Sequence, residues 1–277
     1  MTLFHVFILA VIQGFAELLP VSSSAHVIMA EKLLGLNPSA PDMTFLLVML
    51  HTGTMFAVIV YFWSSWKKTY FSSVQNFKKQ AFYIIAATAV TGCLGLALQS
   101  FIKHVFFGNA ESFEIEHLFS NSKLMAAALF ASGIIIILSS RLKQDQKYEL
   151  DLKKASIIGA VQALCLPFRG FSRSGATIST GLLLGLSRQK VEEFSFALAV
   201  VLTPVIILKE FVRLLHTQAG MHVHMSQFIV PSLVGMVASF IAGLAALKWL
   251  SSWLESGRWH LFGIYCMCFA VVVLALT

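Results

Sequence analysis

Two short polar clusters interrupt a chain that is otherwise strongly apolar, and their residue types could act on a phosphate group. In the first cluster, Glu17 and His26 flank a run of three serines, and in the second, Arg173 lies between two serines. A carboxylate can act as a general base, a serine or histidine as a nucleophile, and a guanidinium can hold phosphate oxygens through two parallel hydrogen bonds. This combination is typical of a site for phosphoryl transfer.

The first cluster would supply the reactive groups. Glu17 is the only carboxylate that the sequence places well inside an apolar segment, and Gln13 precedes it by one helical turn on the same face. Because a carboxylate repels a phosphate, Glu17 either holds a divalent cation, Mg2+ or Ca2+, or acts as a general base. Ser23 and His26 are the two candidates for the nucleophile, and the sequence leaves that choice open.

The serines of both clusters stand just before apolar stretches that we predict as helices, Ala25–Leu34 and Ala176–Leu186. A serine at such a position either caps the helix or lies where free backbone N–H groups and the positive helix end can face a phosphate. The candidates for substrate binding are Gln13, Ser22, Ser24, Ser172, Ser174, Gly175, Thr177 and, more weakly, His51.

Arg173 is expected to bind phosphate. A charged side chain at membrane depth costs about 2.5 to 3.5 kcal/mol on insertion scales and is usually retained for function. The alternative is an ion pair between Arg173 and Glu17, and the two roles are compatible when no substrate is present.

The two clusters are also copies of one pattern. The first reads QGFAELLPVSSSAH from Gln13, the second reads QALCLPFRGFSRSGAT from Gln162, and Ser172 follows Ser22 by 150 residues. The similarity continues downstream, where the stretch from Phe45 resembles the stretch from Phe194. We therefore predict an internal repeat of residues 1–140 and 155–277 within a single integral membrane domain, residues 1–277.

Composition places this domain in a bilayer, because 57% of its residues are hydrophobic and only 12% are charged. The N-terminal segment lacks a basic region and a cleavage site, so we interpret it as structure and not as a signal peptide. Six apolar stretches are expected to span the membrane: Met43–Trp63, Ala81–Phe101, Leu124–Ser140, Phe194–Leu208, Phe228–Leu247 and Leu261–Thr277.

The charges predict how these spans are oriented. Placing the loop after the first span in the cytoplasm puts most of the 20 lysines and arginines inside, including Lys143 and Lys147. Residues 1–42 then enter and leave from the outside, and residues 155–190 from the inside. The predicted fold is all-α and polytopic, with about six transmembrane helices and two re-entrant helical hairpins in an inverted-topology repeat, and a polar cavity between the hairpins.

Three other features of the sequence, its net charge, its cysteines and one histidine pair, give little indication of function. The net charge of +7 comes from basic residues at the ends of apolar segments, which indicates membrane orientation and argues against nucleic acid as a partner. The four cysteines lie in apolar surroundings and are expected to be small buried side chains, not disulfide or metal partners. His222 and His224 form an HxH pair without carboxylate or thiol neighbours, so a metal site there is disfavoured.

The stretch AELLPVSSSAH together with Gln13, and the stretch GFSRSGATIS, resemble the two signature motifs of the undecaprenyl-diphosphatase family, the UppP or BacA bacitracin-resistance proteins. The resemblance covers essentially the whole chain. It implies a phosphoric anhydride hydrolase that converts undecaprenyl diphosphate to the monophosphate carrier for peptidoglycan synthesis. It also implies a multi-pass protein of the bacterial inner membrane whose site opens to the periplasm and uses a divalent metal.

The resemblance assigns the residues of the first stretch to two parts of one motif. The acidic part corresponds to Gln13 and Glu17, and the serine and histidine part corresponds to Ser22, Ser23 and His26. The second stretch corresponds to the phosphate-binding signature. Two departures stand out. Gln13 occupies a position where many members have a second glutamate, so a metal site with two carboxylates is in doubt. Arg169 belongs to an insertion before the signature glycine, where it either adds a phosphate contact or points to the cytoplasmic surface.

The rival function is a flippase for a polyprenyl phosphate, since inverted repeats with broken helices are a transporter design. A transporter does not require a nucleophile beside the phosphate, whereas a phosphatase does, so Ser23 and His26 favour the enzyme. The expected partners are a polyprenyl diphosphate and membrane lipids. The sequence leaves the oligomeric state open and is compatible with a homodimer.

Overall fold

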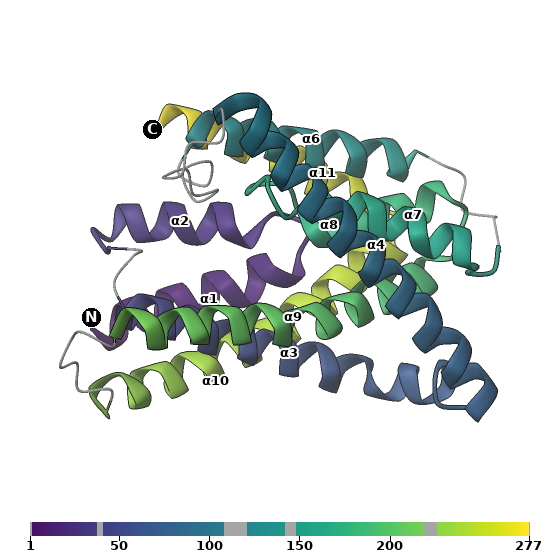
Figure 1. Ribbon diagram of the computed structural model, residues 1–277, viewed down its shortest axis with the longest axis horizontal. Helices are drawn as coiled ribbons and strands as arrows, with labels where there is room; N and C mark the ends of the chain where they lie inside the picture. Colours follow the sequence, from purple (N-terminus) through teal and green to yellow (C-terminus); the bar gives the residue numbers. More distant parts are fainter. Residues whose placement is uncertain (1, 38–40, 108–120, 142–147, 219–225, 277) are drawn as a thin grey trace. The chain divides into compact units, whose positions relative to one another are not determined.

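The computed structural model describes residues 2–37, 41–107, 121–141, 148–218 and 226–276, and within these ranges every regular element is a helix (Figure 1). An isolated bridge between Tyr148 and Leu186 is the one β interaction there. The helices are α1 (Leu3–Leu18), α2 (Ser23–Leu33), α3 (Pro41–Thr69), α4 (Val74–Phe107), α6 (Ser122–Ser140), α7 (Leu152–Ala163), α8 (Arg173–Leu183), α9 (Arg188–Gln218), α10 (Ser226–Glu255) and α11 (Trp259–Ala275). The predicted all-α class is confirmed.

Four stretches of the described helices are long and apolar enough to cross a membrane: Met43–Thr69, Val74–Val105, Ser122–Ser140 and Ile229–Glu255. Two shorter helices, α1 and α11, are also apolar. The protein is therefore a polytopic membrane protein, as predicted. The fourth predicted span lies within α9, which is helical but is not among these four, and α11 contains most of the sixth.

Both serine clusters lie in turns between paired helices, as the prolines indicated. The first turn joins α1 to α2 and contains Pro20, and the second joins α7 to α8 and contains Pro167. Each pair of helices packs together. The turns require unusual backbone, because Ser22 has φ +69° and Gly170 has φ +101°. The hairpins are thus observed, whereas their entry from opposite membrane faces stays a prediction.

The chain forms two compact units, and each is described by itself. Unit 1 comprises Met1–Leu19, Ser23–Ser64 and Ala199–Ser251, and unit 2 comprises Pro20–Ser22, Ser65–Leu198 and Ser252–Thr277. The core of unit 1 joins α1, α2 and α3 through side chains that are nearly or fully buried: Val6, Leu9, Ala10, Val27, Met43, Leu46 and Leu50.

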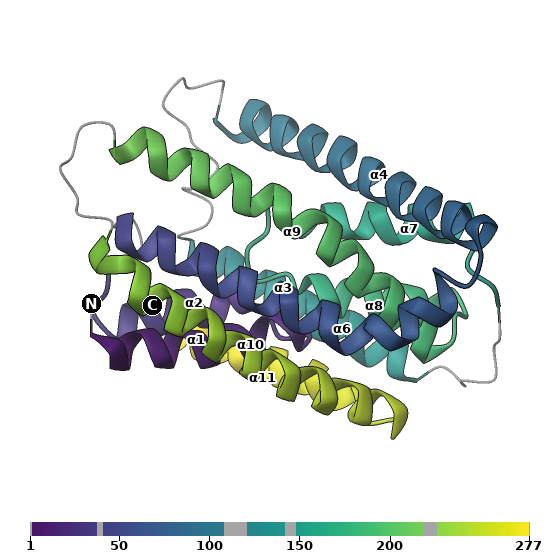
Figure 2. The same ribbon diagram turned by 90° about the horizontal axis from the view of Figure 1, so that it is seen from below.

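Small residues let the helices of unit 1 approach each other closely, and Figure 2 shows α3 and α10 side by side. A Cβ on Gly53 of α3 would collide with the Met236 carbonyl and the Ser239 hydroxyl of α10. That hydroxyl donates to the Leu50 carbonyl at 2.9 Å. On α1, a Cβ on Gly14 would lie 2.5 Å from the Ala242 Cβ. Such contacts drive helix association where lipid is as apolar as the side chains.

Replacing Gly53 with alanine is expected to destabilise the protein by about 1 to 3 kcal/mol, because the added methyl group has no space and must push α3 from α10. Gly92→Ala is the matched control, since Gly92 lies within α4 and a Cβ there would meet nothing within 4 Å. The measurement is the midpoint of thermal unfolding in detergent. Equal midpoints for the two variants would contradict the proposed close packing.

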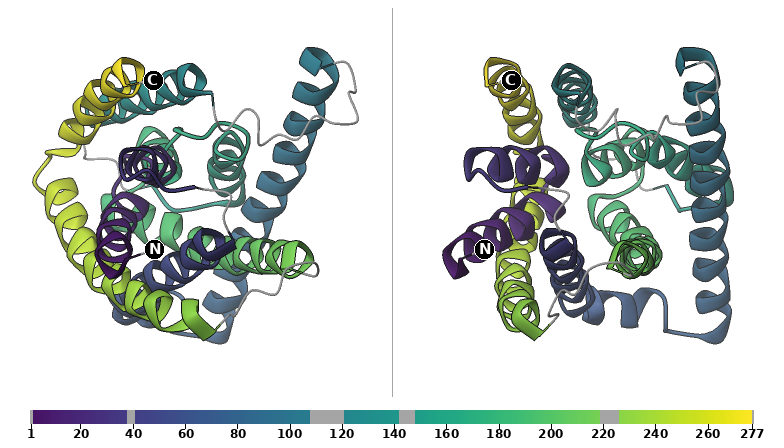
Figure 3. Two further views of the ribbon diagram at one scale, coloured as in Figure 1. Left: turned by 90° about the vertical axis from the view of Figure 1, so that its left-hand side faces the viewer. Right: turned by 60° about the vertical axis from the view of Figure 1, so that its left-hand side comes forward.

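Unit 2 surrounds α8 with other helices. α6 packs along α11, as Figure 3 shows, and also against α8. Trp259 of α11 donates its indole N–H toward Ser139 of α6 at 3.0 Å and Ser179 of α8 at 3.3 Å. α7 is held to α4 by the Thr91 hydroxyl, which lies 2.8 Å from the Gly159 carbonyl. Buried polar contacts therefore join α11 to α6 and α8, and α7 to α4.

The expectation that all four cysteines are buried is wrong for two of them. Cys266 is buried and Cys165 half-buried, but Cys93 and Cys268 are exposed, and all four thiols are free. The reason is that a helix facing lipid is as apolar as one facing a core, so apolar neighbours in sequence do not distinguish the two. His222, His224, Lys143 and Lys147 lie outside the described residues.

Candidate active site

Glu17 is the centre of a polar cluster in unit 1. The Gln13 amide nitrogen donates to Glu17 Oε2 at 3.2 Å, from one turn earlier on α1. The Ser23 hydroxyl donates to the same oxygen at 2.6 Å. Gln13 is 1% exposed, and the Glu17 side chain is 17% exposed. One oxygen of the carboxylate therefore accepts two hydrogen bonds, from an amide and from a hydroxyl.

The position of Ser23 favours nucleophilic chemistry. Ser23 is the first residue of α2, so its hydroxyl stands at a helix end where backbone N–H groups lack helical partners and attract anions. The hydroxyl proton points at Glu17, and the 2.6 Å separation lies within the range for direct proton transfer. In this pairing the carboxylate is placed to take the proton of the serine if the serine attacks a phosphorus atom.

His51 lies at the same carboxylate. Its Nδ1–H donates to the Leu47 carbonyl at 2.8 Å, one turn earlier on α3. Its Nε2 is 3.7 Å from Glu17 Oε2, and the imidazole is 32% exposed. The structure thus brings this weaker sequence candidate to the centre of the cluster. The bond to Leu47 sets the ring orientation and leaves Nε2 facing the acid.

The other candidates of the first cluster, Ser22, Ser24 and His26, lie in the first turns of α2 or directly before it. Ser22 is 5% exposed and adopts the left-handed conformation that non-glycine residues rarely adopt. Ser24 and His26 are half-buried. His26 stands three residues after Ser23 on α2, so the two share a face of the helix. The sequence pattern therefore places all four residues at the beginning of one helix.

In the second motif, the hydroxyl groups are engaged in the fold of unit 2. Ser172 caps α8, because its Oγ accepts the Gly175 N–H at 3.2 Å. Its hydroxyl also lies 3.4 Å from that of Ser174. Thr177 Oγ1 donates to the Arg173 carbonyl at 2.8 Å. For Ser172, this geometry is the capping arrangement, one of the two interpretations that the sequence left open.

Arg173 differs from its neighbours in exposure. Of the residues from Ser172 to Thr177, it is the one that is half-buried, and the others are buried. It is also the first residue of α8. A guanidinium at this point adds to the positive end of the helix. Arg173 is thus the member of the motif whose side chain is best placed to meet a phosphate, while its neighbours form the support.

A family profile described as bacitracin resistance protein BacA matches residues 6–272. This chain belongs to the BacA family. It is 72% identical over 281 residues to undecaprenyl-diphosphatase 2 of Acinetobacter baylyi, covering 100% of this chain and 99% of that protein. It is 32% identical to an undecaprenyl-diphosphatase of Korarchaeum cryptofilum, covering 97% of each chain, and 31% identical to undecaprenyl-diphosphatase 1 of Clostridioides difficile.

The resemblance to the BacA family implies a divalent cation, for which the side-chain oxygens of the Glu17 cluster are the candidate ligands. Among the described residues, no three His, Cys, Asp or Glu side chains gather as a metal site. Glu17 and Ser23 supply one carboxylate and one hydroxyl. Mg2+ is often held by one or two carboxylates together with substrate phosphates and water. The cluster therefore fits a cation that the substrate helps to hold, and not a site built by the protein alone.

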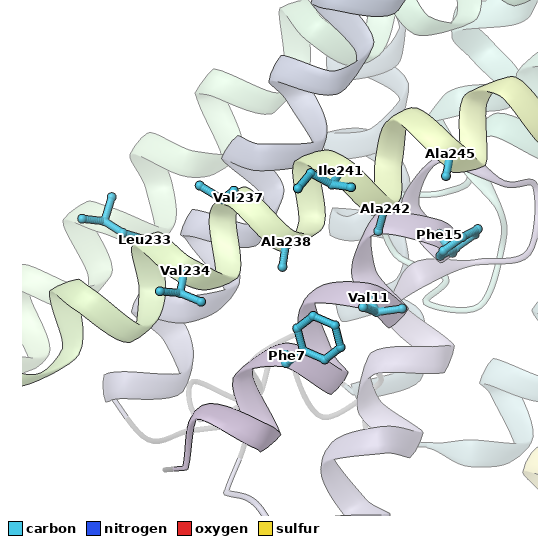
Figure 4. Close-up of a pocket in the computed structure, with 10 residues that line it drawn as sticks. All are labelled: Phe7, Val11, Phe15, Leu233, Val234, Val237, Ala238, Ile241, Ala242 and Ala245. Carbon is cyan, nitrogen blue, oxygen red and sulfur yellow. The ribbon is translucent and has the colours of Figure 1, made fainter.

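Figure 4 shows an apolar pocket in unit 1 of about 650 Å³, between α1 and α10. It is lined by Phe7, Val11, Phe15, Leu233, Val234, Val237, Ala238, Ile241, Ala242 and Ala245. No lining side chain is polar, so this pocket has no group that could bind or cleave a phosphate. It suits only a hydrocarbon chain.

Several buried polar groups were not predicted from the sequence. Glu31 and Glu193 are 1% and 2% exposed, so Glu17 is not the only carboxylate inside the protein. Glu193 accepts hydrogen bonds from Ser65 and Gln189 and thereby ties the end of α3 to the start of α9. These residues lie near helix ends beside lysines, where a sequence pattern indicates solvent and gives no sign of a partner.

Proposed function

We propose that this protein is an undecaprenyl-diphosphate phosphatase, which hydrolyses undecaprenyl diphosphate to undecaprenyl phosphate and inorganic phosphate. The observation that carries the proposal is the hydrogen bond from Ser23 to Glu17, found in a chain that matches a named undecaprenyl-diphosphatase over its whole length. The reaction returns the lipid carrier to peptidoglycan synthesis. Faster recycling of the diphosphate also explains resistance to bacitracin, the property that gives the family its name.

In the proposed reaction, Ser23 attacks the terminal phosphorus while Glu17 takes the hydroxyl proton. The bond from Ser23 Oγ to phosphorus forms, the anhydride P–O bond breaks, and undecaprenyl phosphate leaves with the bonding electron pair. Water then attacks the phosphoserine, the serine oxygen leaves and recovers its proton from Glu17, and inorganic phosphate is released. Positioning and charge neutralisation supply most of the acceleration in such transfers.

Other residues have supporting roles in this proposal. Arg173 binds phosphate oxygens, and the N–H groups at the start of α2 add further donors. Gln13 and His51 orient Glu17. His26 assists Ser23, and it is the alternative nucleophile. A divalent cation, Mg2+ or Ca2+, bound by Glu17 and the substrate would neutralise the phosphate charge.

The proposed setting is the bacterial inner membrane, with the active site open to the periplasm. The substrate is a polyprenyl diphosphate whose chain stays in the lipid, and the protein is compatible with a homodimer. A flippase for polyprenyl phosphate is the second candidate, which the two broken helical hairpins favour. The Ser23 and Glu17 pair distinguishes the two, since transport has no use for a nucleophile with its base.

The proposal is tested by measuring phosphate release from undecaprenyl diphosphate by the purified protein in detergent, with and without a chelator. We expect one phosphate and one polyprenyl monophosphate per turnover, loss of turnover with the chelator, and recovery when Mg2+ or Ca2+ is added. Turnover that resists the chelator would reject the cation while keeping the phosphatase. Absence of phosphate release under all conditions would reject the phosphatase and favour the flippase.

A further inference from the structure

A chain of buried hydroxyl groups runs from α9 to the backbone of Arg173. The Ser195 hydroxyl of α9 is 2.6 Å from Thr177 Oγ1 of α8. Thr177 Oγ1 donates in turn to the Arg173 carbonyl at 2.8 Å. Ser195 is 1% exposed and Thr177 is 0% exposed. The carbonyl of Arg173 is thus connected to a neighbouring helix through two side chains that water does not reach.

A second buried hydroxyl holds the backbone of Ser172, the residue before Arg173. Ser132 of α6 is 0% exposed, and its Oγ accepts the backbone N–H of Ser172 at 2.8 Å. Ser172 directly precedes α8, where N–H groups have no helical partner, so this bond satisfies a donor that would otherwise be buried alone. The backbone is therefore held to α6 at the Ser172 N–H, one residue before Arg173, and to α9 through Thr177 at the Arg173 carbonyl.

These contacts determine the direction in which Arg173 projects. A side chain at the start of a helix follows the orientation of its own backbone. Here that backbone is held to α6 at the Ser172 N–H and, through Thr177 of the same helix, to α9 at the Arg173 carbonyl. Buried hydroxyls are costly when unpaired, so removing one partner changes the arrangement of the rest. Since bidentate phosphate binding demands a defined geometry, a small rotation of Arg173 weakens it strongly.

We propose that Ser195 and Ser132 are positioning residues for phosphate binding, acting on Arg173 through its own backbone and that of Ser172. Neither belongs to the serine motifs, and both are buried inside unit 2, away from any exposed surface. This inference rests on the proposed function, because it concerns how the phosphate-binding arginine of that reaction is oriented. The competing view is that both hydroxyls only stabilise the packing of unit 2.

The experiment is a double-mutant cycle on purified full-length protein, using phosphate release from undecaprenyl diphosphate and inhibition by inorganic phosphate. Ser195→Ala should raise KM and the inhibition constant of phosphate by about tenfold each, the effect of one buried hydrogen bond, with a smaller change in kcat. Ser195→Thr, which keeps the hydroxyl, should recover most of the loss. In an Arg173→Lys background, Ser195→Ala should add less than twofold, because the positioned group is already altered.

Ser139→Ala is the matched control. Ser139 is a buried serine on the same helix as Ser132, and it bonds to Trp259 and its own helix but not to the Arg173 support. It should lower the unfolding midpoint about as much as Ser195→Ala while leaving KM and phosphate inhibition unchanged. If Ser195→Ala does not fold, the same cycle with Ser132→Ala tests the second attachment.

The outcomes separate the inference from the function on which it rests. Absence of phosphate release by the wild type, or wild-type turnover in Arg173→Ala, rejects the proposed function or its site. If Arg173→Ala abolishes turnover but Ser195→Ala matches Ser139→Ala in KM, the function stands and the positioning role is wrong. Full additivity of Ser195→Ala with Arg173→Lys also overturns it, since independent effects mean that Ser195 does not act through the arginine.

Discussion

Replacing Glu17 with glutamine is expected to lower kcat for phosphate release by about 10³-fold with the fold intact. Glutamine has the same size and still accepts a hydrogen bond from Ser23, but it cannot take the serine proton. General-base catalysis contributes about 10² to 10⁴ in rate, so most of that factor should be lost. Purified variants are compared by phosphate release at saturating substrate and by thermal unfolding.

Glu149→Gln is the control, because Glu149 is an exposed carboxylate that pairs with Lys190 in unit 2. It should keep wild-type turnover. Ser23→Ala should be as damaging as Glu17→Gln, and the double variant no worse than either, since groups that act as one unit lose their effect together. Turnover within threefold of wild type in Glu17→Gln would reject its role as base. Normal turnover in Ser23→Ala with collapse in His26→Ala would assign the nucleophile to His26.

Replacing Arg173 with alanine is expected to reduce kcat/KM by about 10² to 10³-fold, the usual consequence of losing one preorganised donor to a developing anion. Arg173→Lys should recover only part of this, because an ammonium group keeps the charge and loses the planar pair of donors. The readouts are kcat, KM and inhibition by inorganic phosphate.

Arg258→Lys serves as the comparison, since Arg258 is exposed before α11 and makes no side-chain capping bond. It should leave all three quantities unchanged. If Arg173→Lys behaves as the wild type, bidentate binding is not required. If Arg173→Ala does so as well, the second motif has no part in binding phosphate.

Most of the helices were predictable from sequence as continuous apolar runs. The fourth run, Phe194–Leu208, is too short to identify a span by length, and it lies within the longer α9. The two hairpins were predictable from Pro20 and Pro167 followed by serines. Within the site, Gln13, Glu17 and Ser23 are close in sequence, and their proximity follows from one helix and one turn. The arrangement of residues within one helix and the turn after it was therefore predictable from their types and spacing.

What could not be predicted depends on contacts between distant segments. Ser132 and Ser195 are single serines within apolar helices, and no spacing pattern distinguishes them from serines facing lipid. The approach of His51 to Glu17 requires that α3 pack against α1, which composition does not specify. The same limitation explains the cysteines, since apolar periodicity does not separate core from lipid.

The left-handed backbone conformation of Ser22 limits which residue types can replace this serine during evolution. Glycine, asparagine and aspartate accept a positive φ readily, whereas bulky or β-branched residues there cost about 1 to 3 kcal/mol and more if they clash. A substitution at Ser22, the residue next to the proposed nucleophile, must therefore be compatible with a positive φ, whatever its effect on the reaction. A new activity arising on this scaffold would have to come from other positions.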